Sequence, residues 1–330
     1  MKKTVVLVSL LILGLLVPLM ANGTKEQGEA YRSEEATVKV MALKGPTAMG
    51  MVNLMKESES GPIDGNTYTF KLAGAVDEVT AALLKGEVDI AALPANLGSV
   101  LYNNTKGKVT ALAINTLGVI YIVESGSTIK SVADLKGKTI FASGKGATPE
   151  YGLNYVLRAN GLEPGKDVQI EWKSEHAECV AAISATENGI AMLPQPFVTT
   201  AQMKNPKIRI ALDLTKEWEA KSGGSSMITG IAVVRTDYLK EHKNAVDKFL
   251  VQYKASVASV NSDTDGAAKL IGSYGIVPEA VAKKALPYCN IVCITGTEMK
   301  TKLSGYLAEL YAQNPKAVGG KLPEDAFYHI

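Results

Sequence analysis

The chain alternates short runs of β-branched and apolar residues with longer segments in which apolar residues recur at helical spacing. Short apolar runs bounded by turn residues predict strands, which we place at 37–43, 68–74, 88–94, 108–115, 139–143, 168–174, 190–194 and 207–214. The clearest helix is DEVTAALLKGE at 77–87, with acids in its first turn and Lys-Gly at its end. Strands that alternate with helices predict an α/β fold of mostly parallel sheets flanked by helices.

The order of these elements occurs twice along the chain. LKGPTAMG (43–50) and GKGATPEYG (144–152) each follow the first strand of a series and precede a helix, and ALPAN (92–96) and MLPQP (192–196) each end a third strand. A solenoid would need at least three short units. The duplication therefore predicts two similar lobes.

Two β-rich connectors, 115–125 and 225–239, join the two series, and helical patterns dominate after the second connector. We therefore expect lobe 1 to comprise 37–117 and 231–330, and lobe 2 to comprise 118–230. The connectors would form two extended hinge crossovers, about which the lobes could close on a ligand.

The N-terminus has the layout of a secretory signal peptide: MKK, an apolar run of 13 residues, and then PLMA. The run is too short for a comfortable membrane span. We expect cleavage after Ala21 and export to the periplasm, with an uncleaved N-terminal anchor as the alternative. Asn22 stands where a lipoprotein would need cysteine. The polar segment 22–36 is predicted to be a flexible leader.

Charge and ligand-type residues exclude several classes of protein. Removal of residues 1–21 takes away two of the 35 basic residues and no acid, which leaves 33 basic and 33 acidic residues, without the surplus typical of a nucleic-acid binder. A metal site would need clustered Cys and His at ligand spacing, but the three histidines are scattered, so we expect no metal; we also expect no cofactor. Cys289 and Cys293 are close enough in sequence to pair, but we favour the interpretation that both, with Cys179, are small buried apolar residues.

The two Lys-Gly-x-Thr turns carry the main candidate chemistry. Neither supplies a P-loop or a dinucleotide fingerprint. Each precedes a helix, whose first turn offers unpaired N–H groups. Gly45 and Gly146 would let the backbone approach a ligand, while Thr47 and Thr148 would either donate to it or merely cap their helices.

Other polar and aromatic residues are placed near the same turns. Asn96 and Gln195 follow matching strands and are either ligand contacts or turn residues; Lys44 and Lys145 would counter an anion or point into water. Tyr151 and Phe197 would stack on a ring or pack within a helix face. The predicted ligand-binding residues are Lys44, Gly45, Pro46, Thr47, Ala95, Asn96, Gly146, Ala147, Thr148, Tyr151, Gln195, Ser226 and Thr229.

Catalytic groups are not evident in the sequence. His176 lies beside Glu175 and Glu178, which predicts a solvated helix start, and no serine lies in GxSxG. These patterns favour a carrier over an enzyme.

Four segments together resemble a known family: LKGPTAMG, VTAALLKGEVDIAALPAN (79–96), 131–162 and GIAMLPQPFVTTA (189–201). In this order they are similar to the solute-binding proteins of ABC importers for sulfonates, nitrate and thiamine precursors, which have the type II periplasmic binding protein fold. The ending GGKLPEDAFYH (319–329) is also similar to the close of many such chains.

The resemblance implies a monomer that captures a small molecule in a cleft and delivers it to a permease with a cytoplasmic ATPase. We expect a small organic nutrient, because neither turn contains the arginine that bidentate binding of a dianion favours. The alternative is a pyrimidine-forming enzyme of the same fold. The resemblance implies that those enzymes depend on a cysteine-rich cluster and a catalytic histidine, and CNIVC (289–293) is a poor substitute for that cluster.

Overall fold

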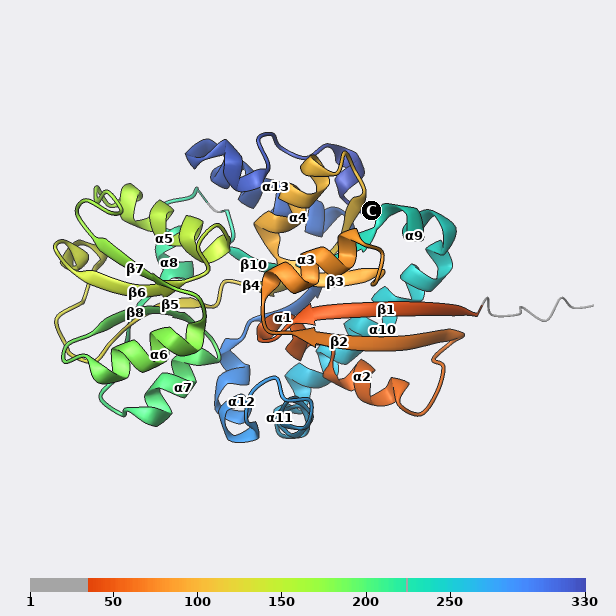
Figure 1. Ribbon diagram of the computed structural model, residues 1–330, viewed down its shortest axis with the longest axis horizontal. Helices are drawn as coiled ribbons and strands as arrows, with labels where there is room; N and C mark the ends of the chain where they lie inside the picture. Colours follow the sequence, from red (N-terminus) through yellow and green to blue (C-terminus); the bar gives the residue numbers. More distant parts are fainter. Residues whose placement is uncertain (1–34, 224) are drawn as a thin grey trace, which may run out of the picture. The chain divides into compact units, whose positions relative to one another are not determined.

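A computed structural model describes residues 35–223 and 225–330, which form two β-sheets with flanking helices (Figure 1). The predicted signal peptide and all but the end of the predicted leader lie outside the described residues. The first sheet has the order β11-β4-β10-β3-β1-β2 and contains β1 (Ala36–Leu43), β2 (Asn66–Ala73), β3 (Ile90–Pro94), β4 (Val109–Leu117), β10 (Ile228–Arg235) and β11 (Ile291–Ile294). The second has the order β7-β6-β8-β5-β9 and contains β5 (Ile120–Glu124), β6 (Thr139–Ser143), β7 (Gln169–Lys173), β8 (Ile190–Pro194) and β9 (Arg209–Asp213).

Both sheets are mixed, which corrects the expectation of mostly parallel sheets. In the first sheet β1 pairs in parallel with β2 and β3, but β10 lies antiparallel between β3 and β4. In the second sheet β6 pairs in parallel with β7 and β8, but β5 lies antiparallel between β8 and β9. β5 and β10 each enter their sheet from the other series, so no strand–helix–strand crossover within the sheet makes them parallel to their neighbours.

The predicted duplication of elements is confirmed by the topology. The order β4-β10-β3-β1-β2 of the first sheet corresponds, strand for strand, to β9-β5-β8-β6-β7 of the second. In the second sheet, β5 is the strand that follows the passage of the chain from the first sheet. In the first sheet, β10 is the strand that follows the return passage from the second sheet. Both sheets lie within one compact unit, so the lobe boundaries 37–117 with 231–330 and 118–230 stay a prediction.

The helices fill the connections between strands. The helices that adjoin the first sheet are α1 (Pro46–Met49), α2 (Val52–Ser58), α3 (Val76–Leu84), α4 (Ala95–Asn104), α9 (Thr236–Glu241), α10 (Lys243–Ser262), α11 (Thr264–Ser273), α12 (Glu279–Ala285) and α13 (Gly296–Gln313). Those of the second series are α5 (Thr148–Ala159), α6 (His176–Ala185), α7 (Phe197–Lys204) and α8 (Leu214–Glu219). Short 3₁₀ turns lie at Val132–Leu135, Leu286–Tyr288, Pro315–Val318 and Asp325–Phe327. Among the described residues, no helix combines the length and apolar character that a membrane span requires.

The core is divided between the faces of the sheets. Val38, Val40 and Ala42 alternate along β1 with exposed or opposite-facing residues and pack into a cluster with α2, α10 and α11. A second cluster joins the other face to residues of the second sheet. There the indole of Trp218 in α8 lies 4.2 Å from the ring of Tyr155 and 5.4 Å from the ring of Tyr306, measured between centroids. Helix α13, late in the chain, thereby packs against the second series.

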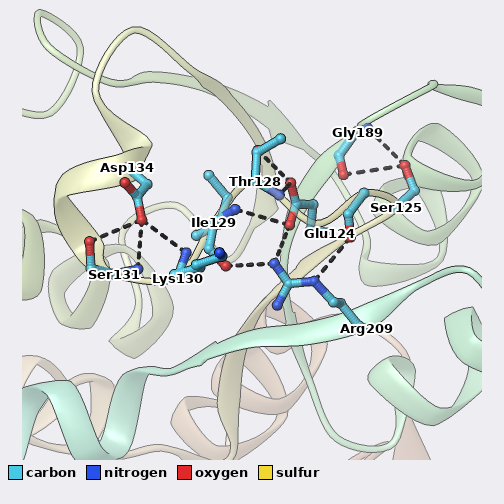
Figure 2. A network of polar contacts seen from close by, with 10 residues as sticks. Glu124, Ser125, Thr128, Ile129, Lys130, Ser131, Asp134, Gly189 and Arg209 are labelled. Carbon is cyan, nitrogen blue, oxygen red and sulfur yellow. Dashed lines mark hydrogen bonds and ion pairs between the residues drawn. The ribbon is translucent and has the colours of Figure 1, made fainter.

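A buried carboxylate organises one end of the second sheet (Figure 2). Glu124, the last residue of β5, is fully buried and forms an ion pair with Arg209 of β9 at 2.5 Å. Its carboxylate also accepts bonds from the backbone N–H groups of Thr128 and Ile129 and from the Thr128 hydroxyl. Burial alone would raise the pKa of Glu124, but the bonds from Thr128, Ile129 and Arg209 hold it below its usual value. The loop after β5 is therefore held by hydrogen bonds to the ionised carboxylate of Glu124.

Candidate functional site

A small cavity of about 80 Å³ lies between residues of the two sheets. Its lining from the first series consists of Leu43, Lys44, Gly45, Pro46, Thr47, Pro94 and Thr229. Its lining from the second series consists of Val119, Ile120, Thr148, Pro149, His176, Pro194, Gln195 and Phe197. The volume is well below the roughly 300–1,000 Å³ of sites that enclose drug-sized molecules. The cavity therefore suits a small solute, or one end of a larger one.

The carboxyl ends of strands supply most of this lining. Leu43 ends β1, Pro94 ends β3, and Pro194 ends β8. Since ligands of open α/β sheets bind beyond these strand ends, the position agrees with the general rule for such folds. Helices α5, α6 and α7 begin at the cavity, and the N–H groups of their first turns have no partner within the helix.

A glycine and a β-bulge shape the wall from the first sheet. Gly45 has φ 125°, a left-handed backbone conformation that favours glycine, and it lets the chain turn from β1 into α1. Thr229 lies in β10 at a shift of register against β4, between the pairs Ile228–Leu117 and Gly230–Thr116. Such irregularities re-aim a side chain, and here Thr229 lines the cavity.

The structure brings together about half of the sequence-predicted site residues. Lys44, Gly45, Pro46, Thr47, Thr148, Gln195 and Thr229 line the cavity. Ala95, Asn96, Gly146, Ala147, Tyr151 and Ser226 lie outside its lining. Contact of any of these residues with a ligand stays a prediction.

Two of the predicted donors are engaged within the protein. The Asn96 amide nitrogen donates to the carbonyl oxygens of Ala317 at 3.1 Å and of Gly146 at 3.4 Å, and its oxygen accepts from the Thr148 hydroxyl at 3.4 Å. Asn96 and Thr148 are both fully buried. Their side chains therefore connect the end of β3 to the GKGAT turn.

The remaining polar side chains differ in which atoms are free. The Thr47 hydroxyl donates to the carbonyl of Leu43 at 2.7 Å, a local bond of the turn. The Gln195 oxygen accepts from the Thr199 hydroxyl at 2.9 Å, while its amide nitrogen makes no hydrogen bond within residues 35–223 and 225–330. The Thr229 hydroxyl oxygen is buried and has no partner in the described part of the chain. Gln195 and Thr229 thus offer unused polar atoms.

His176, which the sequence predicted to lie on a solvated helix start, instead lines the cavity. It is the first residue of α6 and half-buried; its Nδ1 is hydrogen-bonded to the hydroxyl of buried Ser143, the last residue of β6. Its ring centroid lies 4.9 Å from that of Phe197. Burial lowers the pKa of His176 to about 4, so the ring is neutral at pH 7. One sequence signal could have placed His176 at the cavity. It follows a predicted strand closely, as the other residues of the candidate site do.

The charge of the lining is slightly positive. Among the described residues that line the cavity, Lys44 is the one cation and no carboxylate is present. Lys145, the second predicted anion partner, is exposed and does not line it. A larger hollow of about 610 Å³ lies beside Lys106 and Arg235, at the start of β4 and the end of β10, and is lined by none of the predicted site residues.

Comparison with known families decides what kind of protein has this architecture. The sequence model for the phosphonate-type periplasmic substrate-binding proteins of ABC transporters matches residues 54–279. The chain belongs to this family. It is therefore a solute-binding component of an ABC importer and works outside the cytoplasm with a membrane permease and its ATPase. A search of curated proteins found no significant match.

Solved structures agree on the type II periplasmic binding protein fold of this family. An ABC transporter protein from Parabacteroides distasonis has a TM-score of 0.75 and 24% identity, over 90% of this chain and 99% of that chain. The aliphatic sulphonate binding protein SsuA from Escherichia coli has a TM-score of 0.69 and 18% identity, over 86% and 90%. SsuA from Xanthomonas axonopodis bound to MOPS has a TM-score of 0.66 and 18% identity, over 88% and 96%.

The cysteines of this family member are all free, so Cys289 and Cys293 form no disulfide. Cys179 and Cys289 are buried, as we favoured, whereas Cys293 is half-buried. Burial raises the pKa of Cys289 to about 12 and that of Cys293 to about 11. Both thiols are therefore protonated at neutral pH, unlike an activated nucleophile.

Proposed function

We propose that this ABC importer component captures a small organic solute in the cavity between the two sheets, through Lys44, Gln195, Thr229 and the first turns of the adjoining helices. The observation that carries the proposal is the buried, unpartnered Thr229 hydroxyl on an otherwise largely apolar wall. A buried hydroxyl without a partner is costly to a protein. A polar atom of the solute would satisfy it.

The chemistry of the lining narrows the solute. One exposed lysine, helix N-termini and neutral donors favour an uncharged or singly charged group. A dianion would call for the bidentate guanidinium groups that this wall lacks among its described residues. The similarity in fold to sulfonate-binding proteins and the match to a phosphonate family both support an oxyanion as the polar end.

The exported form is part of the same proposal. We infer that cleavage after Ala21 releases a monomer that carries the solute to its permease without altering it chemically and without binding nucleic acid. The protonated thiols of the CNIVC segment give the enzyme alternative no support. The family match gives it none either.

A panel of solutes tests this function. Native mass spectrometry of the protein purified from its own host should detect a bound small molecule. Thermal unfolding with methanesulfonate, methylphosphonate, nitrate and uracil should show a rise in midpoint with at least one of them; at 100 times the dissociation constant, a ligand adds about 2.7 kcal/mol. No bound molecule and no stabilisation by any probe would contradict the proposal.

The Thr229→Val variant locates the site. Valine has nearly the same shape and removes an unsatisfied hydroxyl, so stability should be kept or slightly raised. Binding of the effective probe should weaken roughly tenfold, the equivalent of one hydrogen bond. Thr301→Val, on the exposed surface of α13, is the matched control and should bind normally. Unchanged affinity in Thr229→Val would place the solute elsewhere.

A further inference from the structure

Two of the helices that begin at the cavity, α5 and α6, carry a carboxylate of the chain itself in their first turn. Glu150 of α5 accepts a hydrogen bond from the backbone N–H of Gly146 at 2.6 Å. Glu178 of α6 accepts one from the backbone N–H of Ser174 at 3.1 Å. The first residues of both helices line the cavity. Both carboxylates therefore lie close to the place where a solute would bind.

The charges of these two carboxylates are not cancelled by ion pairs. In the described part of the chain, neither lies within ion-pair distance of a cation. Lys173 of β7 is close enough to Glu178 to interact with it, but Lys173 is paired with Glu171 at 2.5 Å. Lys145 and Glu175, in the turns before the two helices, are exposed and have opposite signs. The starts of α5 and α6 thus carry an excess of negative charge.

This excess works against the attraction that a helix start has for anions. The unpaired N–H groups and the dipole of a helix favour a negative charge at its N-terminus, and a carboxylate in the first turn supplies that charge from within the chain. An anion in the cavity would be repelled by both carboxylates in proportion to its own charge. Lys44, the one cation among the described lining residues, could offset a single negative charge.

We propose that Glu150 and Glu178 are specificity-determining residues, which select an uncharged or monoanionic solute against a dianionic one. The inference rests on the proposed function of the cavity and adds a means of distinguishing oxyanions of the same shape. Neither carboxylate has to touch the solute, because Coulomb repulsion extends beyond contact distance and is only partly screened near a protein surface. The solute class that follows is an uncharged compound or a monoanion, such as a sulfonate.

Three tetrahedral probes of similar shape separate charge from all other effects. Dimethyl sulfone is uncharged, methanesulfonate carries one negative charge and sulfate carries two. The variant combines Glu150→Gln with Glu178→Gln, since glutamine accepts the same bonds at this position of a helix. By isothermal titration calorimetry, the wild type should bind sulfate more weakly than methanesulfonate. The double variant should bind dimethyl sulfone as before, methanesulfonate about threefold more tightly and sulfate about tenfold more tightly.

A control variant with the same change in net charge distinguishes a local effect from a general one. Glu279→Gln combined with Glu298→Gln removes first-turn carboxylates from α12 and α13, neither of which begins at the cavity, and should leave all three affinities unchanged. Equal changes for the three probes in the Glu150 and Glu178 variant would indicate altered packing and refute the inference. Wild-type protein that binds sulfate as tightly as methanesulfonate would refute it as well, with solute binding itself intact.

A measurement without any solute decides the inference if none of the three probes binds and the proposed solute class fails. Pro46→Cys places a thiol on the opposite wall of the cavity. We would compare its rates of reaction with sulfonatoethyl and trimethylammonioethyl methanethiosulfonate, which are an anion and a cation; their ratio is independent of the pKa of the thiol. The chain without this substitution gives the background of its own three thiols. The ratio of anionic to cationic rates should rise roughly tenfold when Glu150 and Glu178 become glutamine. An unchanged ratio would overturn the proposal.

Discussion

The buried Glu124–Arg209 pair allows a sharp test of how the second sheet is stabilised. Glu124→Gln keeps the shape of the side chain but replaces one acceptor oxygen with a donor. One oxygen now accepts from the Thr128 backbone at 2.8 Å and hydroxyl at 2.6 Å; the other accepts from Ile129 at 3.2 Å and Arg209 at 2.5 Å. In either orientation the new NH₂ group therefore faces two donors.

The expected loss follows from this geometry. Removal of one partner of a buried ion pair costs about 3–5 kcal/mol. Arg209 is 36% exposed and keeps its bonds to the carbonyls of Gly126 and Ile129, so we expect the lower end, about 3 kcal/mol. Glu163→Gln is the matched control, because Glu163 pairs with Arg158 at 2.9 Å on the surface, where both side chains are about half exposed. That pair should contribute about 0–1 kcal/mol.

Urea denaturation of the chain without residues 1–21, followed by far-UV circular dichroism, measures both variants. If the sheets unfold in separate transitions, the Glu124→Gln effect should fall on the transition of the second sheet. Losses that agree within about 0.5 kcal/mol would refute the reasoning that burial separates the two pairs.

The same variant has a pH signature with a definite sign. The pKa of Glu124 is lowered in the folded protein, so its stabilising contribution is fully present above its unfolded pKa of about 4.3 and is lost as the pH falls through the folded value. The difference in unfolding free energy between wild type and Glu124→Gln should therefore be constant from pH 7 to pH 5. It should shrink only in acid below the unfolded pKa; a difference that already narrows at pH 6 would contradict this assignment.

Two further expectations concern the crossover and the thiols. In Gly118→Ala, between β4 and β5, the new Cβ would lie 2.0 Å from the Thr215 hydroxyl oxygen, so we expect a loss of about 1–3 kcal/mol in urea denaturation, partly recovered by Thr215→Ala. Gly305→Ala, which meets open space within α13, should instead stabilise the protein by up to about 1 kcal/mol, and equal effects of the two alanines would be inconsistent with a steric cause. Cys289 and Cys293 should react slowly with a thiol reagent at pH 8 in the native protein and rapidly in denaturant, because their pKa values are raised to about 12 and about 11. Rapid native labelling would contradict the raised pKa values, and a mass lower by two hydrogens after purification would show a disulfide in place of two free thiols.

Much of the fold could be predicted from local patterns. The strands at 139–143 and 190–194 were predicted with the bounds that the structure has, since turn residues mark both ends of each run. The turn LKGPTAMG was expected to precede a helix, but it contains a helix of its own, α1, which is separated from α2 near Gly50. There a Cβ would lie 2.9 Å from a side-chain carbon of Ile291, in a strand far along the chain. The short β11 and α8 were not predicted as elements.

The direction of the crossing strands was beyond local reasoning. The segments that contain β5 and β10 were predicted as extended crossovers between the lobes, whereas each forms a strand inside a sheet, antiparallel to its neighbours, because its direction depends on how the chain enters that sheet. His176 shows the same limit for the site. Its adjacent acids favoured a solvated position, whereas Ser143, 33 residues away in the sequence, holds the ring at the cavity.

The sequence by itself determined the alternation of strands and helices, the paired turns and the family, because these depend on residue types at short spacing. Only the tertiary structure decided which polar groups are free for a solute. Asn96 and Thr148 satisfy one another, and Thr47 bonds its own turn, while Thr229 and the Nε2 of His176 retain unused hydrogen-bonding capacity among the described residues. The reason is physical: whether a buried donor is satisfied depends on groups brought together across the sheets, and no local pattern specifies them.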